Sequence, residues 1–332
     1  MKIYNNNIIE VLFSCIIKIL LVLSQKGNIM DNKAVLAKIR ENIRSAVILP
    51  GEVIDNILIC LCCGGHVLLE DMPGTGKTTL AKALAGSIDV AFGRIQCVPD
   101  ILPSDITGIN YFNQKENEFV FKRGPVFANI VLADEINRAS PRSQAALLEC
   151  MEEKQVTVDN QTHILALPFM LIATQNPIET RGTFPLPEAQ LDRFMMKLSL
   201  GYPPKESERD VITMNLNKTP VKEIRPVASG EDITALNQSL AEITLSAPVR
   251  DYIVEIIRAT REHNHIKAGA SPRAGIALAR ASAARALLRG RGYVLPDDVK
   301  ALAGPVLAHR LITDDADILE VIIGEIRAPV TE

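Results

Sequence analysis

The chain has 332 residues, with 36 lysines and arginines against 39 aspartates and glutamates, so its net charge is −3. This balance excludes a protein that is strongly basic throughout, as many nucleic-acid-binding proteins are, although a local basic patch stays open. A hydrophobic content of 47% excludes a disordered, collagenous or coiled-coil chain, and the length is typical of about two domains.

Residues 1–29 differ in composition from the rest of the chain, being rich in Ile, Asn, Lys and Leu. Their apolar stretch, 8–23, is interrupted by Glu10 and Lys18, so it falls short of the roughly 20 apolar residues that a membrane span requires. No small-residue cleavage site follows it. We interpret Met30 as the natural start and residues 1–29 as a non-native extension, with a membrane-associating leader as the alternative.

The six cysteines are scattered along a chain that is too long to need disulfide bonds for its stability. We therefore expect reduced thiols in a cytoplasmic protein. Cys60, Cys62 and Cys63 are close in sequence, but no second C-x-x-C pair or suitably spaced histidine accompanies them. Small buried residues of a helix are a better interpretation of this cluster than a metal site.

After residue 30, short apolar runs alternate with longer segments of helical periodicity. Val35, Leu36, Ile39, Ile43 and Val47 follow helical spacing and predict an amphipathic helix. Continuous apolar runs separated by helices are typical of a parallel sheet that is covered on both faces. The runs that we predict as buried strands are 66–70, 129–133 and 169–173.

Two further segments, 109–121 and 155–167, each place two alternating apolar stretches around a polar turn, which predicts β-hairpins. Pro203 and Pro204 then interrupt the chain, so we place a domain boundary between an α/β core, 30–203, and a helical domain, 204–332. In the second domain the apolar spacing predicts helices over 251–260, 272–288, 297–303 and 317–326.

A glycine-rich loop joins the first predicted strand to a predicted helix, the context that a phosphate-binding P-loop requires. Its backbone N–H groups and the helix N-terminus would bind phosphate oxygens. Lys77 would reach the β- and γ-phosphates, and the Thr78 hydroxyl would hold Mg²⁺. Asp71 replaces the usual first glycine, and an acid there is unfavourable unless it points away. The proposed nucleotide-binding residues are Met72, Pro73, Gly74, Thr75, Gly76, Lys77, Thr78 and Thr79.

Polar residues also follow the other two predicted strands. Asp134 and Glu135 come directly after 129–133, and Asn176 follows 169–173. The carboxyl ends of parallel strands face the ligand crevice of an open α/β sheet. Two adjacent acids there need a cation and a polarised water, so we expect Asp134 to bind Mg²⁺ and Glu135 to activate the attacking water. The amide of Asn176 could hold that water or the γ-phosphate.

The stretches 64–82, 134–139, 182–194 and 269–274 together resemble the MoxR family of AAA+ ATPases, and the resemblance extends from about residue 30 to the C-terminus. It implies an α/β fold, in which a P-loop parallel sheet lies between helices, with a C-terminal all-helical lid domain. It also implies two β-hairpin insertions, which match the two predicted hairpins. ATP and Mg²⁺ are the expected ligands, and the resemblance implies a homo-oligomeric ring, commonly a hexamer, with ATP sites between subunits.

The same resemblance gives roles to individual residues. Asn176 corresponds to sensor 1, and Arg193 to the arginine finger that acts on the ATP of a neighbouring subunit. Arg138 and Arg181 compete with Arg193 for that role. An arginine supplied across an interface accelerates hydrolysis by roughly 10³–10⁵.

Arg273 corresponds to sensor 2 of the lid. Ser271 is typical of a helix N-cap, which places Arg273 in the first turn, where a cation opposes the helix dipole. An anion beside Arg273, such as the γ-phosphate, would explain that placement. The resemblance puts Ile48 and Gly51 on the adenine side of the nucleotide, and Gln96 is placed to modulate Glu135.

The resemblance implies a chaperone-like ATPase that remodels or activates partner proteins, among them proteins with a von Willebrand factor A domain, in some cases for metal or cofactor insertion. An ATPase subunit of the magnesium-chelatase type is the main alternative. A nucleic-acid motor has little support from a net charge of −3. The complete set of Lys77, Asp134, Glu135, Asn176 and Arg193 argues against an inactive nucleotide-binding scaffold.

Overall fold

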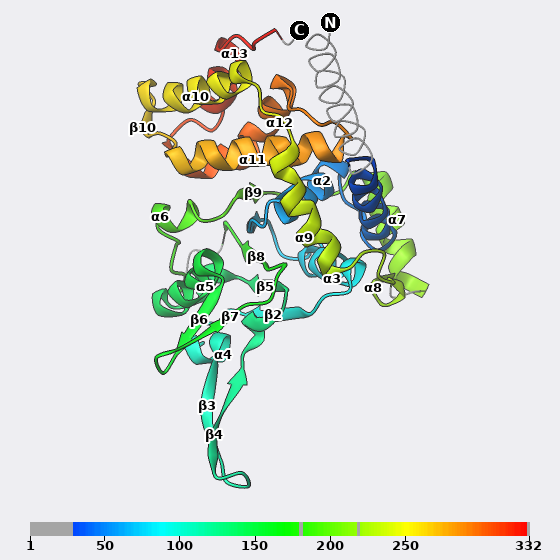
Figure 1. Cartoon of the computed structure of the whole chain (residues 1–332), viewed down its shortest axis with the longest axis vertical. Coiled ribbons are helices and arrows are strands. Elements are labelled where there is room, and N and C mark those ends of the chain that lie inside the picture. Colours follow the sequence, from blue (N-terminus) through cyan, green and yellow to red (C-terminus); the bar gives the residue numbers. More distant parts are fainter. Residues whose placement is uncertain (1–28, 179–181, 218–219, 331–332) are drawn as a thin grey trace, which may run out of the picture.

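The computed structural model of the chain describes residues 29–178, 182–217 and 220–330. At its centre lies a five-stranded sheet in which all neighbouring strands are parallel (Figure 1). The predicted parallel sheet is therefore confirmed, and three of its strands are the runs expected from the sequence. In spatial order the strands are β2 (Phe92–Gln96), β5 (Ile130–Asp134), β8 (Met170–Gln175), β1 (Val67–Glu70) and β9 (Met196–Leu198).

Helices cover both faces of this sheet. Along β5, Ile130 and Leu132 belong to the apolar cluster that also contains residues of α3, whereas Val131 and Ala133 belong to a second cluster with residues of α5. Both faces of the strand are thus buried, which explains its uninterrupted apolar sequence. The helices of this part are α2 (Gly51–Cys62), α3 (Lys77–Ile88), α4 (Pro103–Thr107), α5 (Pro141–Glu153) and α6 (Glu188–Leu191), with 3₁₀ turns η1 (Pro125–Phe127) and η2 (Ile136–Arg138).

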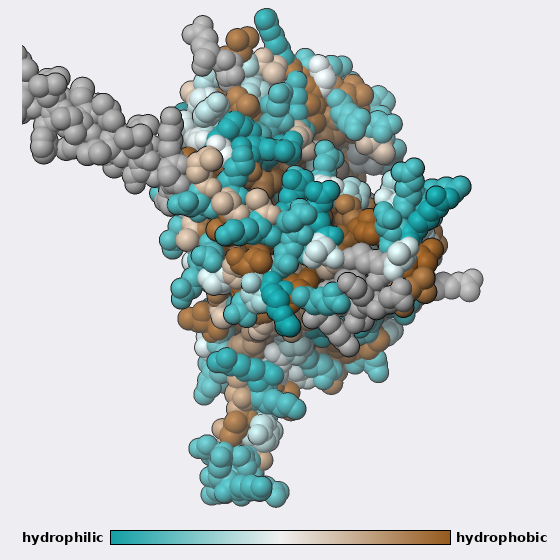
Figure 2. Space-filling model, turned by 90° about the vertical axis from the view of Figure 1, so that its right-hand side faces the viewer, coloured by the Kyte–Doolittle hydropathy of each residue, from teal (hydrophilic) through white to brown (hydrophobic). Residues whose placement is uncertain are grey.

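The two predicted hairpins are confirmed as β3 (Gly108–Asn113) with β4 (Glu118–Arg123), and β6 (Gln155–Val158) with β7 (Gln161–Ile164). The β3–β4 hairpin projects far from the body of the molecule (Figure 1). Its tip is hydrophilic, and apolar residues lie between the tip and the sheet (Figure 2). Phe119 is 75% exposed there and packs edge-on against Phe112.

Helices dominate the C-terminal part, which also contains a pair of short antiparallel strands, β10 (Ile266–Ala268) and β11 (Ile312–Thr313). These strands were not predicted, because two or three residues are too few to show a strand period. The helices are α7 (Lys205–Asn217), α8 (Pro220–Glu223), α9 (Gly230–Ser239), α10 (Ala247–Glu262), α11 (Pro272–Leu288), α12 (Pro296–Leu307) and α13 (Ile318–Glu325), with 3₁₀ turns η3 (Leu240–Glu242) and η4 (Ala308–Arg310).

The amphipathic helix predicted after Met30 spans 29–46, and its Leu36, Ile39 and Ile43 are fully buried. The interpretation of the extension concerns residues outside the described part of the chain, apart from residue 29. Among the helices of the described residues, none combines the length and the apolar composition of a membrane span.

The clustered cysteines lie on α2 and at its C-terminal end. Cys60, Cys62 and Cys63 are buried free thiols, in agreement with their interpretation as small core residues. Burial raises the pKa of the Cys63 thiol to about 12, so this group stays protonated. Within the described residues, no group of three His, Cys, Asp or Glu side chains is arranged to hold a metal ion.

Candidate active site

The glycine-rich loop connects β1 to α3 at the carboxyl edge of the sheet. Gly74 and Gly76 have positive φ angles of 86° and 93°, which favour glycine, and α3 begins immediately after Gly76. Lys77 folds back over the loop, and its Nζ donates to the backbone oxygens of Asp71 at 2.8 Å and Met72 at 3.3 Å. Burial lowers the pKa of Lys77, and the nearby carboxylates oppose that shift.

Asp71 points away from the phosphate loop, as an acid at this position must. Its carboxylate accepts hydrogen bonds from the Ser199 hydroxyl at 2.8 Å and from the backbone N–H groups of Leu200 at 2.6 Å and Gly201 at 3.1 Å. These donors lie just after β9, where the chain leaves the sheet toward α7. Asp71 therefore ties the phosphate loop to the segment that leads into the C-terminal helices.

The two acids lie at the end of β5, as expected. On the neighbouring strand β8, the Thr174 hydroxyl donates to Oδ1 of Asp134 at 2.7 Å and accepts the backbone N–H of Glu135 at 2.8 Å. Thr174 is fully buried, and Glu135 has a positive φ of 57°. The sequence analysis did not single out Thr174, although a hydroxyl at the end of a buried strand is the signal that could have identified it.

Both acids also have arginine partners. Arg94 on β2 places Nη2 at 2.8 Å from Oδ2 of Asp134 and at 2.7 Å from Oε1 of Gln96. The Nε of Arg138 lies 3.1 Å from Oε2 of Glu135. Gln96 lies beside Glu135, as expected, with its Nε2 at 3.5 Å from the same carboxylate oxygen. The sequence analysis did not single out Arg94, because its contact with Asp134 depends on the pairing of β2 with β5 in the folded sheet.

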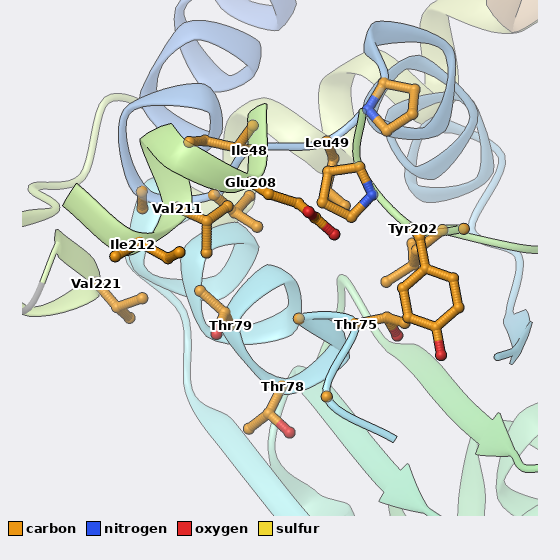
Figure 3. A pocket seen from close by; sticks show the side chains of 18 of the residues that line it. Ile48, Leu49, Thr75, Thr78, Thr79, Tyr202, Glu208, Val211, Ile212 and Val221 are labelled. Carbon is orange, nitrogen blue, oxygen red and sulfur yellow. The ribbon is translucent and has the colours of Figure 1, made fainter. Parts of the chain in front are cut away.

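A cavity of about 770 Å³ opens beside the phosphate loop, a size suited to a nucleotide. Gly74, Thr75, Gly76, Thr78 and Thr79 line one side of it. Ile48 and Leu49 line another, and Glu208, Val211 and Ile212 reach it from α7 (Figure 3). Tyr202 and Pro203, between β9 and α7, line a further part of the wall.

The remaining nucleotide-binding candidates lie next to these lining residues. Met72 and Pro73 precede Gly74 in the loop, and Lys77 is the first residue of α3. Gly51 begins α2, directly after the lining residue Pro50. The donors offered to a metal are the hydroxyl of Thr78 and the carboxylate of Asp134, and hard oxygen ligands of this kind fit Mg²⁺.

Asn176 follows the last residue of β8, and its Oδ1 accepts the backbone N–H of Ile178 at 3.2 Å. Gln175, the residue before it, accepts the backbone N–H of Asp71 at 3.2 Å through its carbonyl oxygen. The end of β8 is thus held against the base of the phosphate loop, so Asn176 lies at the same edge of the sheet.

Arg193 and Arg273 share one carboxylate. Nη2 of Arg193 lies 3.2 Å from Oε2 of Glu152, and Nη1 of Arg273 lies 3.2 Å from Oε1 of the same side chain. The anion beside Arg273 is therefore Glu152, and neither arginine is among the described residues that line the cavity. Arg138 contacts Glu135 instead, and Arg181 lies outside the described residues.

Comparison with known proteins gives a consistent family assignment. The model of the ATPase family associated with various cellular activities (AAA) matches residues 66–196, and the AAA lid domain model matches residues 258–322. Protein YeaC of Bacillus subtilis is 48% identical over 282 residues, which are 85% of this chain and 88% of YeaC.

Two further similarities extend over most of the chain. Chaperone MoxR1 of Mycobacterium tuberculosis is 41% identical over 270 residues, which are 79% of this chain and 71% of MoxR1. A solved structure of a Cytophaga hutchinsonii protein, described as a candidate ATPase, superposes with a TM-score of 0.86 at 39% identity, covering 93% of this chain and 99% of that chain. From its fold, its strand-end motifs and these similarities, the chain belongs to the MoxR family of AAA+ ATPases.

Proposed function

We propose that the protein hydrolyses ATP with Mg²⁺ and uses the energy to remodel or activate a partner protein. One observation carries the hydrolytic part of this proposal: Thr174 holds Asp134 and Glu135 together at the strand ends that adjoin the phosphate loop and its cavity. A phosphate-binding loop with two acids at the next strand ends is the arrangement that phosphoryl transfer to water requires.

Each residue then has a distinct task. The loop amides and Lys77 bind the phosphates, while Ile48 and α7 enclose the base. Thr78 and Asp134 would hold Mg²⁺, which neutralises charge on the phosphates when it is bound. Glu135 accepts the proton of the attacking water, and Asn176 orients that water or the γ-phosphate.

The arginines support an assembly in which subunits complete each other's sites. Arg193 and Arg273 lie together on Glu152 and apart from the cavity lining of their own subunit. We infer that they act on the ATP of a neighbouring copy, in a homo-oligomeric ring that we expect to be a hexamer. Arg193 is the arginine finger of this proposal, and Arg273 is the sensor of the lid.

The chaperone-like part of the proposal rests on the family. A relative that covers most of this chain is named chaperone MoxR1. We expect the partner to be a protein with a von Willebrand factor A domain, activated by insertion of a metal or cofactor in some cases. The projecting β3–β4 hairpin, with its exposed Phe119, is a suitable contact for such a partner. The five described cysteines are free thiols, which supports a reducing, cytoplasmic location.

Subunit mixing tests the hydrolytic proposal. Arg193→Ala should keep ATP binding and lose hydrolysis by roughly 10³-fold. Glu135→Gln should also bind ATP without hydrolysing it. Mixing the two inactive proteins should restore activity, because Glu135→Gln subunits supply Arg193 to sites that keep Glu135. A mixture that stays inactive contradicts action across the interface.

The partner can be identified with the same variant. Full-length Glu135→Gln protein, loaded with ATP and Mg²⁺, should retain the ATP-bound assembly with its partner from a native extract. Recovery of a protein with a von Willebrand factor A domain supports the activator function. Recovery of chelatase subunits or of nucleic acid contradicts it.

A further inference from the structure

We propose that Glu152 is a positioning residue that holds Arg193 and Arg273 side by side, so that both reach the same phosphate of an ATP molecule bound to a second copy of this chain. This inference rests on the proposed function, in which the two arginines act on a neighbouring subunit. It assigns to Glu152 a part in the reaction although the carboxylate itself need not touch the nucleotide.

The three side chains come from three different elements. Glu152 is the penultimate residue of α5, Arg193 follows α6, and Arg273 is the second residue of α11. Each oxygen of the Glu152 carboxylate contacts a different guanidinium, at 3.2 Å in both cases. One side chain of the α/β core therefore sets the distance between an arginine of the core and an arginine of the lid.

Electrostatics explain why the pair needs this carboxylate. Two guanidinium groups held close together repel each other, and Arg273 also lies in the first turn of α11, where the helix dipole disfavours a cation. A shared anion relieves both effects. A guanidinium has five N–H donors, and Glu152 engages one nitrogen of each arginine, so donors are left to bind phosphate oxygens.

The backbone beneath the arginines is fixed by a second, buried arginine site. The Arg310 side chain is 3% exposed; its Nε lies 3.1 Å from Oδ1 of Asp192, and its Nη2 donates to the backbone oxygens of Asp192 and Phe194. Ser271, the N-cap of α11, donates through its hydroxyl to Oδ2 of Asp192 at 3.4 Å. The main chain beside Arg193 and the main chain beside Arg273 are thus both anchored, and Glu152 fixes the two guanidinium groups.

The group is accessible to a partner. The side chains of Arg193, Arg273 and Glu152 are 31%, 49% and 36% exposed, whereas Arg310 beneath them is enclosed. Two arginines around one acid leave a net positive charge at this surface. A polyanion such as the terminal phosphate of a nucleotide, presented by a second copy, matches this charge and the planar donors of arginine.

The first test measures kcat and KM for ATP in full-length Glu152→Gln, with Glu153→Gln as the matched control. The glutamine side chain keeps the size of the original but loses its charge, so we expect kcat to fall by about ten- to a hundredfold through misplaced arginines. KM should stay nearly constant because the subunit's own cavity is unchanged. Glu153→Gln, one residue further along α5, should change kcat by no more than about twofold.

The second test separates positioning from damage to the fold. A small amount of Glu152→Gln protein is mixed into a large excess of Glu135→Gln subunits, whose Glu152, Arg193 and Arg273 are intact. The hydrolysis rate per Glu152→Gln active site should then equal the rate per active site of wild-type protein that is mixed into the same excess of Glu135→Gln subunits. A deficit that persists in the mixture overturns the inference, as does an unchanged kcat of Glu152→Gln alone.

Arg193→Ala, mixed in the same way, distinguishes a failure of the proposed function from a failure of the role of Glu152. If Arg193→Ala regains activity in the mixture while Glu152→Gln fails either test, the proposed function stands and only the role of Glu152 falls. If Arg193→Ala does not regain activity, action across the interface falls, and the role of Glu152 falls with it.

Discussion

The hydroxyl of Thr174 lies 2.7 Å from Oδ1 of Asp134, on the neighbouring strand of the sheet. The hydroxyl oxygen of Thr174 also accepts the backbone N–H of Glu135, so one buried hydroxyl orients both the proposed metal ligand and the proposed base. Because this contact lies between the strand ends, it aligns β5 with β8 at the edge where the nucleotide would bind.

Thr174→Val keeps the shape of the side chain and removes the hydroxyl. The Glu135 N–H and the Asp134 carboxylate would each lose a partner, so we expect the free energy of unfolding to fall by about 1–3 kcal/mol. Hydrolysis should fall by at least about tenfold, which corresponds to about 1.4 kcal/mol in the activation free energy. Denaturant unfolding and steady-state kinetics measure both effects. Thr174→Ser should retain most of the activity, and equal losses in both variants would contradict the role of the hydroxyl.

Asp71→Gly restores the usual first glycine of the phosphate loop, yet we expect it to be harmful. The carboxylate accepts hydrogen bonds from Ser199, Leu200 and Gly201. A hydrogen bond to a charged group contributes about 1.5–3 kcal/mol to the free energy of unfolding. We expect a lower melting temperature and weaker ATP binding, measurable by calorimetry and by titration with a fluorescent nucleotide. Asp71→Asn, which keeps an acceptor oxygen, should be milder; a stabilised Asp71→Gly protein would contradict the assignment.

Arg94 contacts the carboxylate that we propose as a ligand of Mg²⁺. The Arg94 side chain is 47% exposed, so its ion pair with Asp134 is worth up to about 1 kcal/mol. Arg94→Gln should therefore lower the Mg²⁺ concentration for half-maximal hydrolysis by up to about fivefold. A magnesium titration of the ATPase rate measures this, with Lys122→Gln on the β3–β4 hairpin as control. A higher magnesium requirement in Arg94→Gln would show that the arginine assists metal binding.

His66 makes stability depend on pH. Its Nδ1 accepts the N–H of Leu171 at 2.9 Å and its Nε2 faces the carbonyl oxygen of Met151 at 3.0 Å, so the ring is neutral with its proton on Nε2. Burial lowers the pKa of His66 to about 4. The unfolded chain binds a proton here below about pH 6.5 that the folded chain does not bind. The free energy of unfolding should thus fall by up to about 1.4 kcal/mol per pH unit from this residue, down to about pH 4.

Spectra of protein labelled with ¹⁵N-histidine provide the measurement for His66. The ring should keep the neutral form with its proton on Nε2 as the pH is lowered from neutral toward 5. Protonation of His66 in the folded protein near pH 6.5 would contradict the enclosed site.

Much of the α/β core could be predicted because its signals are local. The apolar runs of β1, β5 and β8 are uninterrupted, since both faces of these strands are buried, and the phosphate loop needs glycines at fixed positions. The hairpins were predictable from alternation around polar turns. The short β10–β11 pair had no such signal, because its register depends on tertiary contacts.

The site was less predictable wherever a side chain acts through a distant partner. Nothing near Glu152 in the sequence indicates that Arg193 and Arg273 converge on it, since the three belong to separate elements. Asp71 likewise contacts residues more than a hundred positions away. Its deviation from the usual motif was visible, but its partners required the fold.

The two hairpins are joined to each other as well as to the body. The Asn110 side chain donates to Asp159 at 2.8 Å, and the ring of Phe121 stacks on His163 at a centroid distance of 4.1 Å. Residues 165–169 then lead from β7 directly into β8. We therefore expect a displacement of the β3–β4 hairpin to reach β8 at its amino end, Met170, so that its effect would pass along this strand to Thr174 at the nucleotide edge of the sheet.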